Sequence, residues 1–233
     1  MGSRAAVLEE LVHAVCGAGA VVAVDGPDAA GKTTLADELA DRLGHRGAPT
    51  VRVTLDGFHR PAAARRARGS LSPIGYVEDS FDLAAFADDV LEPLGAGGDR
   101  MIVTARHDWR TDAAVAPDPV HVPEEACVLV DGVFLHSPEL ADRWDASVFV
   151  YADPEVVLAR ARARDADAFG GPAEVERRYA ARYLPGQALY FARDRPDRRA
   201  TVCVENSDPA QPQLSRAAVA AGIARWIEEH GGG

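Results

Sequence analysis

The feature that most limits what this chain can fold into is a glycine-containing loop, Gly26-Pro27-Asp28-Ala29-Ala30-Gly31-Lys32-Thr33-Thr34. It fits the pattern G-x-x-x-x-G-K-[ST], which is typical of a phosphate-binding P-loop. The apolar, β-branched run at residues 20–25 precedes it and predicts a buried strand. Leu35, Leu39 and Leu43 follow at helical spacing, with acidic residues between them. Because a P-loop needs a strand before it and a helix after it, the sequence predicts that this loop binds phosphate.

The chemistry of the loop follows from its backbone. Gly26 and Gly31 allow a tight turn, so that successive N–H groups can point inward at one anion, and the following helix adds its positive N-terminal end. We expect Lys32 to reach the β- and γ-phosphates of a nucleotide, Thr33 to hold Mg²⁺ and Thr34 to contact the α-phosphate. The predicted nucleotide-binding residues are Gly26, Asp28, Ala29, Ala30, Gly31, Lys32, Thr33 and Thr34.

The composition limits the remaining function classes. The 233 residues are 47% hydrophobic, enough for one sizeable α/β unit, and we expect a single domain over residues 1–233. The formal net charge of -11 argues against a general nucleic-acid binder, which is usually basic. Cys16, Cys127 and Cys203 lie far apart in apolar runs, as in a protein of a reducing compartment. No signal peptide or membrane-length apolar run is recognisable, so we expect no membrane association and a cytoplasmic location.

Strands alternate with helices along the chain. Apolar runs predict four more strands, at residues 50–55, 127–131, 147–151 and 201–204. Helical spacing predicts helices at residues 3–16, 81–94, 154–165 and 214–229. This alternation predicts a three-layer α/β fold, with a mostly parallel five-stranded sheet and helices on both faces. Residues 57–80 show no period and predict a long loop, and residues 101–103 and 120–122 could form a short hairpin.

Two acidic residues end or follow predicted strands, at the edge where open α/β sheets bind ligands. Asp56 comes after the run 50–55 and could accept a proton from an attacking hydroxyl or hold a Mg²⁺-bound water. A turn or helix-cap role is the alternative for Asp56. Asp131 ends the run 127–131 as a Walker B acid does, which indicates a place in a magnesium shell. A strand-end turn is the alternative for Asp131, because Asp-Gly is a common turn pair.

Arginines are the candidates for neutralising the charge of a transferring phosphoryl group. Arg160 and Arg164 lie four residues apart and therefore share one face of a predicted helix. An ordinary solvated helix face is the alternative interpretation. The arginines between residues 60 and 68 are assigned no role, because loop arginines often have none.

Loop side chains complete the set of candidates. His59 and His107 stand beside acidic or aromatic residues, but no pair of histidines has the H-E-x-x-H or another metal-binding spacing. Asp108 and Trp109 could hydrogen-bond to and stack on a base, or could serve packing alone. No G-x-S-x-G sequence occurs, so no esterase-like triad is indicated.

Taken in order, these residues resemble the uridine kinase family of P-loop kinases, in a branch also near pantothenate kinase and phosphoribulokinase. The resemblance covers roughly residues 18–208. It rests on the P-loop, Asp56-Gly57-Phe58-His59, Phe81-Asp82, Asp108-Trp109, Asp131-Gly132-Val133-Phe134-Leu135, residues 160–165 and residues 178–185. It implies a P-loop kinase fold with a mobile lid at about residues 160–180, and transfer of the ATP γ-phosphate to a primary hydroxyl.

The resemblance also implies roles for individual residues. Asp56 matches the catalytic aspartate, and Asp82 matches the acid that binds ribose hydroxyls. Arg160 and Arg164 match arginines of the lid. Asp108 and Trp109 match a base-binding loop, and His59 is placed with the substrate-binding residues.

The chain departs from the family at its substrate motifs. Uridine kinases typically have Asp-Ser-Phe-Tyr where this chain has Asp56-Gly57-Phe58-His59, which is more like pantothenate kinase. The sequence therefore indicates an ATP- and Mg²⁺-dependent kinase of a small molecule, with uridine or a related nucleoside favoured over pantothenate or a sugar. An ATP-binding regulator with weak hydrolysis is a further alternative, whereas the lack of Asn-Lys-x-Asp argues against a switch GTPase. Assembly into a homo-oligomer stays open.

Overall fold

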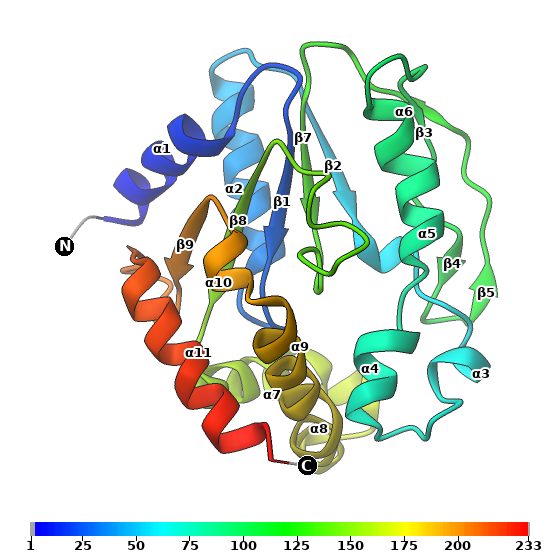
Figure 1. The fold of residues 1–233 in the computed structure, drawn as a ribbon, viewed down its shortest axis with the longest axis vertical. Helices are drawn as coiled ribbons and strands as arrows, with labels where there is room; N and C mark the ends of the chain where they lie inside the picture. Colours follow the sequence, from blue (N-terminus) through cyan, green and yellow to red (C-terminus); the bar gives the residue numbers. More distant parts are fainter. Residues whose placement is uncertain (1–2, 233) are drawn as a thin grey trace.

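A mostly parallel sheet forms the centre of the structure, a computed structural model that describes residues 3–232. Its strand order is β10-β9-β8-β1-β7-β2 (Figure 1). The strands are β1 (Val21–Asp25), β2 (Thr50–Thr54), β7 (Cys127–Asp131), β8 (Ala146–Tyr151), β9 (Val202–Glu205) and β10 (Gln213–Leu214). The five strands that the sequence predicts all run parallel, which confirms the α/β sheet. The short strand β10 pairs antiparallel at the edge and makes the sheet six-stranded, which the sequence does not predict.

The inner strands β1 and β7 are almost entirely apolar because the sheet is covered on both faces. Every residue of both strands is buried. Strand β7 pairs with β1 on one side and β2 on the other, in a register that places Asp131 opposite Val24 and Thr54. The carboxyl ends of β1, β7 and β2 therefore lie side by side, and the residues after them meet at one edge of the sheet.

Helices pack on both faces of the sheet. In Figure 1, α2 lies behind the sheet and α9 and α10 lie in front of it. On β8, Phe149 and Tyr151 point to the same side because side chains alternate along a strand. Their rings pack on Phe191 of α9 and Trp226 of α11, with ring centroids 5.8 Å and 6.1 Å apart. No helix within residues 3–232 combines the length and the apolar character needed to cross a bilayer.

The helices that the sequence predicts around the sheet are present, with bounds close to the predicted ones, and further helices accompany them. The helices around the sheet are α1 (Arg4–Val15), α2 (Lys32–His45), α7 (Pro154–Phe169), α8 (Pro172–Arg178), α9 (Leu184–Asp194), α10 (Pro196–Arg199) and α11 (Arg216–His230). A π-helical turn, η3 (Tyr179–Tyr183), joins α8 to α9. Helix α7 continues to Phe169, past the predicted end at residue 165, and stops at Gly170 and Gly171, which both have positive φ.

The segment between β2 and β7 holds the largest difference from the sequence prediction. Instead of a loop throughout residues 57–80, two short helices form, α3 (Ala62–Arg65) and α4 (Pro73–Asp79). Ser72 caps α4 by accepting a hydrogen bond from the Gly75 N–H, and Pro73 suits its first turn. Helices this short show too few turns to produce a readable hydrophobic period.

The rest of this segment follows the predictions more closely. The predicted helix at residues 81–94 is present, with a π-helical turn in its middle. Its parts are α5 (Leu83–Phe86), η2 (Ala87–Leu91) and α6 (Glu92–Leu94). The predicted hairpin forms from β3 (Met101–Ile102) and β6 (Val120–His121), which pair antiparallel. A second small pair lies between them, β4 (His107–Asp108) with β5 (Ala113–Ala114).

Candidate active site

The P-loop turns sharply between β1 and α2. Gly26 and Gly31 have positive φ values of 151° and 100°, and Ala29 lies in the left-handed region at 57°. A Cβ on Gly26 would overlap the carbonyl oxygen of Val150, so only glycine fits at this position. Helix α2 begins at Lys32, which brings its first N–H groups to the loop. The local geometry is that of an anion-binding turn at a helix N-terminus.

Lys32 is the buried cation of this loop. Its Nζ donates a hydrogen bond to the Pro27 carbonyl oxygen at 2.8 Å, and its side chain is almost inaccessible to solvent. Burial lowers the pKa of the amine, and nearby carboxylates oppose the shift, with Asp28 the strongest. A bound phosphate would supply the close negative charge that compensates the burial of this ammonium.

Thr33 and Asp131 form the polar pair expected of a magnesium site. Thr33 Oγ1 donates to Asp131 Oδ2 at 2.7 Å, and Arg52 Nη2 donates to Asp131 Oδ1 at 2.6 Å. Mg²⁺ in nucleotide sites is usually bound by one or two side-chain oxygens together with substrate phosphates. A hydroxyl oxygen oriented by a buried carboxylate fits this pattern. The role of Arg52, which holds the second carboxylate oxygen, was not visible in the sequence.

Asp56 lies in a short 3₁₀ turn, η1 (Leu55–Gly57), directly after β2. Its backbone N–H donates to Thr54 Oγ1 at 3.3 Å, which fixes the turn. The side chain still reaches solvent, but the protein around it desolvates the carboxyl in part and raises its pKa. The charges of Lys32 and Asp131 also act on this pKa, as expected of a residue beside the P-loop. A carboxylate with a raised pKa at this position can accept a proton from a hydroxyl.

Three aromatic rings, those of His59, Phe81 and Trp109, lie close together near Asp56 in the chain or in space. His59 Nδ1 lies 2.8 Å from the Asp56 carbonyl oxygen. The His59 ring lies 4.3 Å from that of Phe81 and 5.9 Å from that of Trp109, centroid to centroid. Burial lowers the pKa of His59, which favours the uncharged ring. The structure thus brings together His59 and Trp109, two of the predicted substrate-binding residues, near the predicted base.

Asp82 and Asp108, the other predicted substrate-binding residues, stabilise local turns. Asp82 caps α5, its Oδ1 accepting from the Ala85 N–H at 3.0 Å. Asp108 accepts from the Arg110 N–H at 2.9 Å and from Thr111 Oγ1 at 3.0 Å. The backbone bond from Arg110 is the main reason that the pKa of Asp108 is lowered. Carboxylates can accept further hydrogen bonds, so contact of either residue with substrate stays a prediction.

The two predicted lid arginines occupy different environments. The Arg160 guanidinium donates to four carbonyl oxygens at 2.8 to 3.3 Å, those of Ala29, Ala30, Asn206 and Ser207. It therefore ties the P-loop to the end of β9, which differs from the predicted place over a transferring phosphoryl group. Arg164 is exposed on α7 and pairs with Asp165 at 2.6 Å, a bond that raises its pKa. Of the two, Arg164 remains the candidate for phosphate contact.

Three side chains that fasten the P-loop were missed by sequence reasoning. The Tyr76 hydroxyl donates to the Asp28 carboxylate and accepts from Gln187 Nε2 at 3.0 Å. Asn206 Nδ2 donates to the Ala30 carbonyl oxygen at 2.8 Å. The available signal for Asn206 was its place two residues after the strand predicted at residues 201–204. Tyr76 and Gln187 come from α4 and α9, and nothing in the sequence relates them to the loop.

Comparisons with known sequences show limited similarity. No protein-family model matches the chain. The chain is 28% identical over 149 residues to uridine-cytidine kinase B of Dictyostelium discoideum, which is 62% of this chain and 58% of that protein. It is also 26% identical over 143 residues to the tRNA-specific adenosine deaminase subunit tad2 of Schizosaccharomyces pombe, which is 60% of this chain and 32% of that protein. The chain thus spans less than two thirds of the length of either relative.

Solved structures share the fold over most of the chain. A protein described as a possible uridine kinase from Bacillus stearothermophilus matches with a TM-score of 0.67 and 17% identity, over 86% of this chain and 96% of that one. A candidate fructose transport system kinase from Silicibacter sp. TM1040 matches with a TM-score of 0.66 and 23% identity, over 82% of this chain and 95% of that one. These matches confirm the predicted three-layer P-loop kinase fold. The similarity to uridine kinase-like proteins that the motifs indicate is found again in both kinds of comparison.

Proposed function

We propose that this chain is a phosphotransferase that moves the γ-phosphate of ATP to a hydroxyl of a small molecule, with Mg²⁺ bound. The observation that carries the proposal is the order of groups along one sheet edge. The P-loop follows β1, Asp131 is the last residue of β7, and Asp56 lies in the turn after β2, with β7 in the middle. This order supports a phosphate site with a carboxylate beside it that can face an acceptor. Similarity to a uridine-cytidine kinase supports the same class of reaction.

Each group has a distinct role in the proposed reaction. The loop amides and Lys32 bind the triphosphate. The Thr33 hydroxyl, oriented by Asp131, would hold Mg²⁺, which would supply neutralisation of phosphate charge. Asp56 acts as the candidate base and takes the proton of the acceptor hydroxyl. Arg164 neutralises charge on the transferring group, and exclusion of water by the lid at about residues 160–180 would favour transfer over hydrolysis.

For the acceptor, the sequence resemblance supports uridine or a related nucleoside, phosphorylated on the 5′-hydroxyl. The aromatic pair of His59 and Trp109 supports binding of a flat ring. Pantothenate or a sugar is the second candidate, because the stretch Asp56-Gly57-Phe58-His59 is more like that of pantothenate kinase. An ATP-binding regulator with weak hydrolysis is the third. We further propose that the chain acts as a single cytoplasmic domain.

The proposal is tested by incubating the purified chain with ATP, Mg²⁺ and one acceptor at a time. The acceptors are uridine, cytidine, pantothenate and fructose, with ADP followed by a coupled assay and the phosphorylated product by mass spectrometry. The Lys32→Ala variant, prepared in parallel, controls for contaminating kinases. We expect ADP formation that depends on an acceptor. Slow ADP formation at the same rate without any acceptor would favour the regulator instead.

A further inference from the structure

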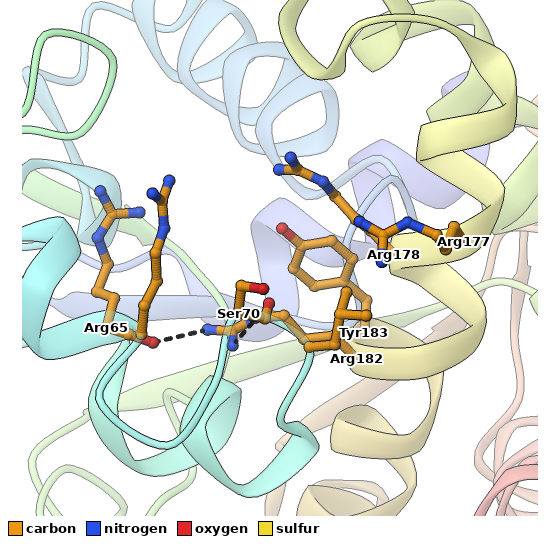
Figure 2. Close-up of a pocket in the computed structure, with 8 residues that line it drawn as sticks. Arg65, Ser70, Arg177, Arg178, Arg182 and Tyr183 are labelled. Atoms are coloured by element: carbon orange, nitrogen blue, oxygen red, sulfur yellow. Dashed lines mark hydrogen bonds between the residues drawn. The ribbon is translucent and has the colours of Figure 1, made fainter.

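Five arginines surround one pocket of about 270 Å³. Its lining residues are Arg65, Arg66, Ser70, Leu71, Arg177, Arg178, Arg182 and Tyr183. Figure 2 shows Arg65 and Arg178 on opposite sides, with Arg182 and Ser70 between them. The lining contains no aspartate or glutamate, although the chain as a whole carries a net charge of -11. This arginine pocket therefore concentrates positive charge against the overall composition.

Not all of this charge is compensated. Three of the arginines have acidic partners outside the lining: Arg65 with Asp112 at 3.4 Å, and both Arg177 and Arg178 with Glu174 at 2.7 Å. The ion pairs found within residues 3–232 include neither Arg66 nor Arg182. Two guanidinium charges at the pocket are thus left without a carboxylate.

Arg182 is buried, so its positive charge without a carboxylate partner is energetically unfavourable. Its guanidinium donates only to neutral groups, at 3.2 to 3.4 Å: the carbonyl oxygens of Ser70, Ser72 and Arg65 and the hydroxyl of Ser80. Burial is the main cause that lowers the pKa of Arg182. Tyr183 and Tyr76 oppose this shift, and the charges of Arg65 and Arg66 add to it. A buried cation among neutral acceptors and other cations is stabilised by an added anion.

The arginine pocket lies next to the candidate active site. Tyr183, which lines it, packs edge-on against Tyr76 with ring centroids 5.0 Å apart, and the Tyr76 hydroxyl is bonded to Asp28 of the P-loop. On the other side, Arg65 Nε donates to the carbonyl oxygen of Arg60 at 2.7 Å, and a ring nitrogen of the preceding residue, His59, contacts the backbone of the candidate base. These contacts connect the arginine pocket to the P-loop through Tyr76 and to the backbone of the candidate base through His59.

We propose that the arginine pocket binds a phosphate or carboxylate group of the acceptor. The acceptor is then an anionic alcohol, such as a sugar phosphate or a hydroxy acid, rather than a neutral nucleoside. Guanidinium groups bind phosphate and carboxylate alike through paired N–H donors. The experiment below distinguishes the two anions. The inference rests on the proposed phosphotransfer, and it reverses the order of candidate acceptors: an anionic acceptor such as pantothenate comes before uridine, since a neutral nucleoside has no anionic group for this pocket.

The first experiment compares acceptors that differ mainly in the anionic group. The pairs are fructose 6-phosphate with fructose, and pantothenate with pantothenyl alcohol, and uridine is run alongside. ADP formation is measured with ATP and Mg²⁺ at several acceptor concentrations. We expect kcat/KM for the charged member of at least one pair to exceed that of its neutral partner by about tenfold or more, the worth of one charge-assisted hydrogen bond.

The second experiment removes one charge from the pocket. Arg66 is exposed, so Arg66→Gln should leave the fold intact, which circular dichroism checks. We expect KM for the charged acceptor to rise by about tenfold and KM for ATP to stay unchanged. Arg66→Lys should recover most of the loss, because it restores the charge. Arg225→Gln is the matched control, since Arg225 is exposed and pairs with Asp153 away from the pocket.

The outcomes separate the inference from the proposed function. Equal turnover of the charged and neutral partners, or turnover of uridine alone, would overturn the inference while the kinase function stands. Weaker ATP binding in Arg66→Gln with an unchanged KM for the acceptor would also overturn it, because the pocket would then serve the donor's phosphates. Lack of ADP formation with every acceptor would overturn the proposed function, and the inference with it.

Discussion

His136 Nδ1 lies 2.7 Å from Oδ2 of Asp25, the last residue of β1, and both side chains are buried. The Tyr190 hydroxyl of α9 donates to the same carboxylate. The other carboxylate oxygen of Asp25 accepts from the Gly26 N–H at 2.7 Å. The first peptide of the P-loop is therefore fixed by a buried carboxylate, which is itself held by α9 and by the loop after β7.

Removing one donor from Asp25 should destabilise the fold. In Tyr190→Phe the buried carboxylate loses a hydrogen bond while the ring still fills its place. We expect the free energy of unfolding to fall by about 1–3 kcal/mol, as measured by urea denaturation at pH 7. Tyr183→Phe, at a half-buried tyrosine, is the control and should change stability little. Equal free energies of unfolding for the two variants would mean that the Tyr190 hydrogen bond to Asp25 does not stabilise the fold.

Lys32 is the only lysine in the sequence. An amine-directed acylating reagent can therefore modify only this side chain and the N-terminal amine. Because burial lowers the pKa of Lys32, more of it is uncharged and nucleophilic than in an exposed lysine. We expect ATP at 100 times its Kd to slow modification of Lys32 by about 100-fold, as followed by peptide mapping. The N-terminal amine serves as the internal control, and modification of Lys32 at an unchanged rate would contradict its role in phosphate binding.

The sheet and the P-loop could be predicted because their signals are local. A strand made almost only of apolar residues, such as β1, predicts burial on both faces of the sheet. Gly26 and Gly31 indicate a tight turn in which a Cβ would clash with neighbouring atoms. Asp131 could be placed because it ends a buried apolar strand, and Asp56 because it comes shortly after a β-branched run, since parallel strands end at one edge of the sheet. The edge strand β10 could not be predicted, since two residues carry no period.

The supporting contacts could not be predicted, because they join segments far apart in sequence. Arg160 was correctly predicted to lie on a helix, but its hydrogen bonds to P-loop carbonyls depend on where α7 packs. Arg66 was assigned no role, because it lies far in sequence from the arginines at residues 177–182. These arginines line one pocket only because the two segments pack together. Sequence patterns thus predict which backbone elements form the site, whereas the charge around it comes from tertiary packing.

Arg164 should affect the rate more than the binding of ATP. It is exposed on α7. In the proposed reaction its charge would meet negative charge that develops during transfer. We expect Arg164→Ala to lower kcat by about 10²-fold or more, with a smaller change in the Kd for ATP measured by calorimetry. Arg162→Ala is the matched control, because Arg162 is also exposed on α7 and pairs with Glu176. If both variants keep the wild-type kcat, these arginines belong to an ordinary solvated helix face.

The raised pKa of Asp56 gives the candidate base a signature in the pH profile. A base must be deprotonated to act. The ordinary pKa of an aspartate is about 3.9, and because the pKa of Asp56 is raised, its protonation begins at a higher pH. We therefore expect kcat/KM to fall as the pH drops, with a midpoint above that value. An acidic limb at the ordinary position would contradict the desolvation of Asp56 in the working enzyme.

Replacing Asp56 by asparagine separates its three candidate roles, because shape and polarity stay while the ability to take a proton is lost. If Asp56 is the base, kcat falls by about 10²–10⁴ and the acidic limb changes, while nucleotide affinity in calorimetry stays the same, since the phosphates are held by the P-loop. If Asp56 organises magnesium, affinity for Mg²⁺-ATP falls together with kcat, and added Mg²⁺ restores part of both. If Asp56 only stabilises the turn after β2, activity stays near wild type while Tm falls, and Asp56 then has no part in catalysis.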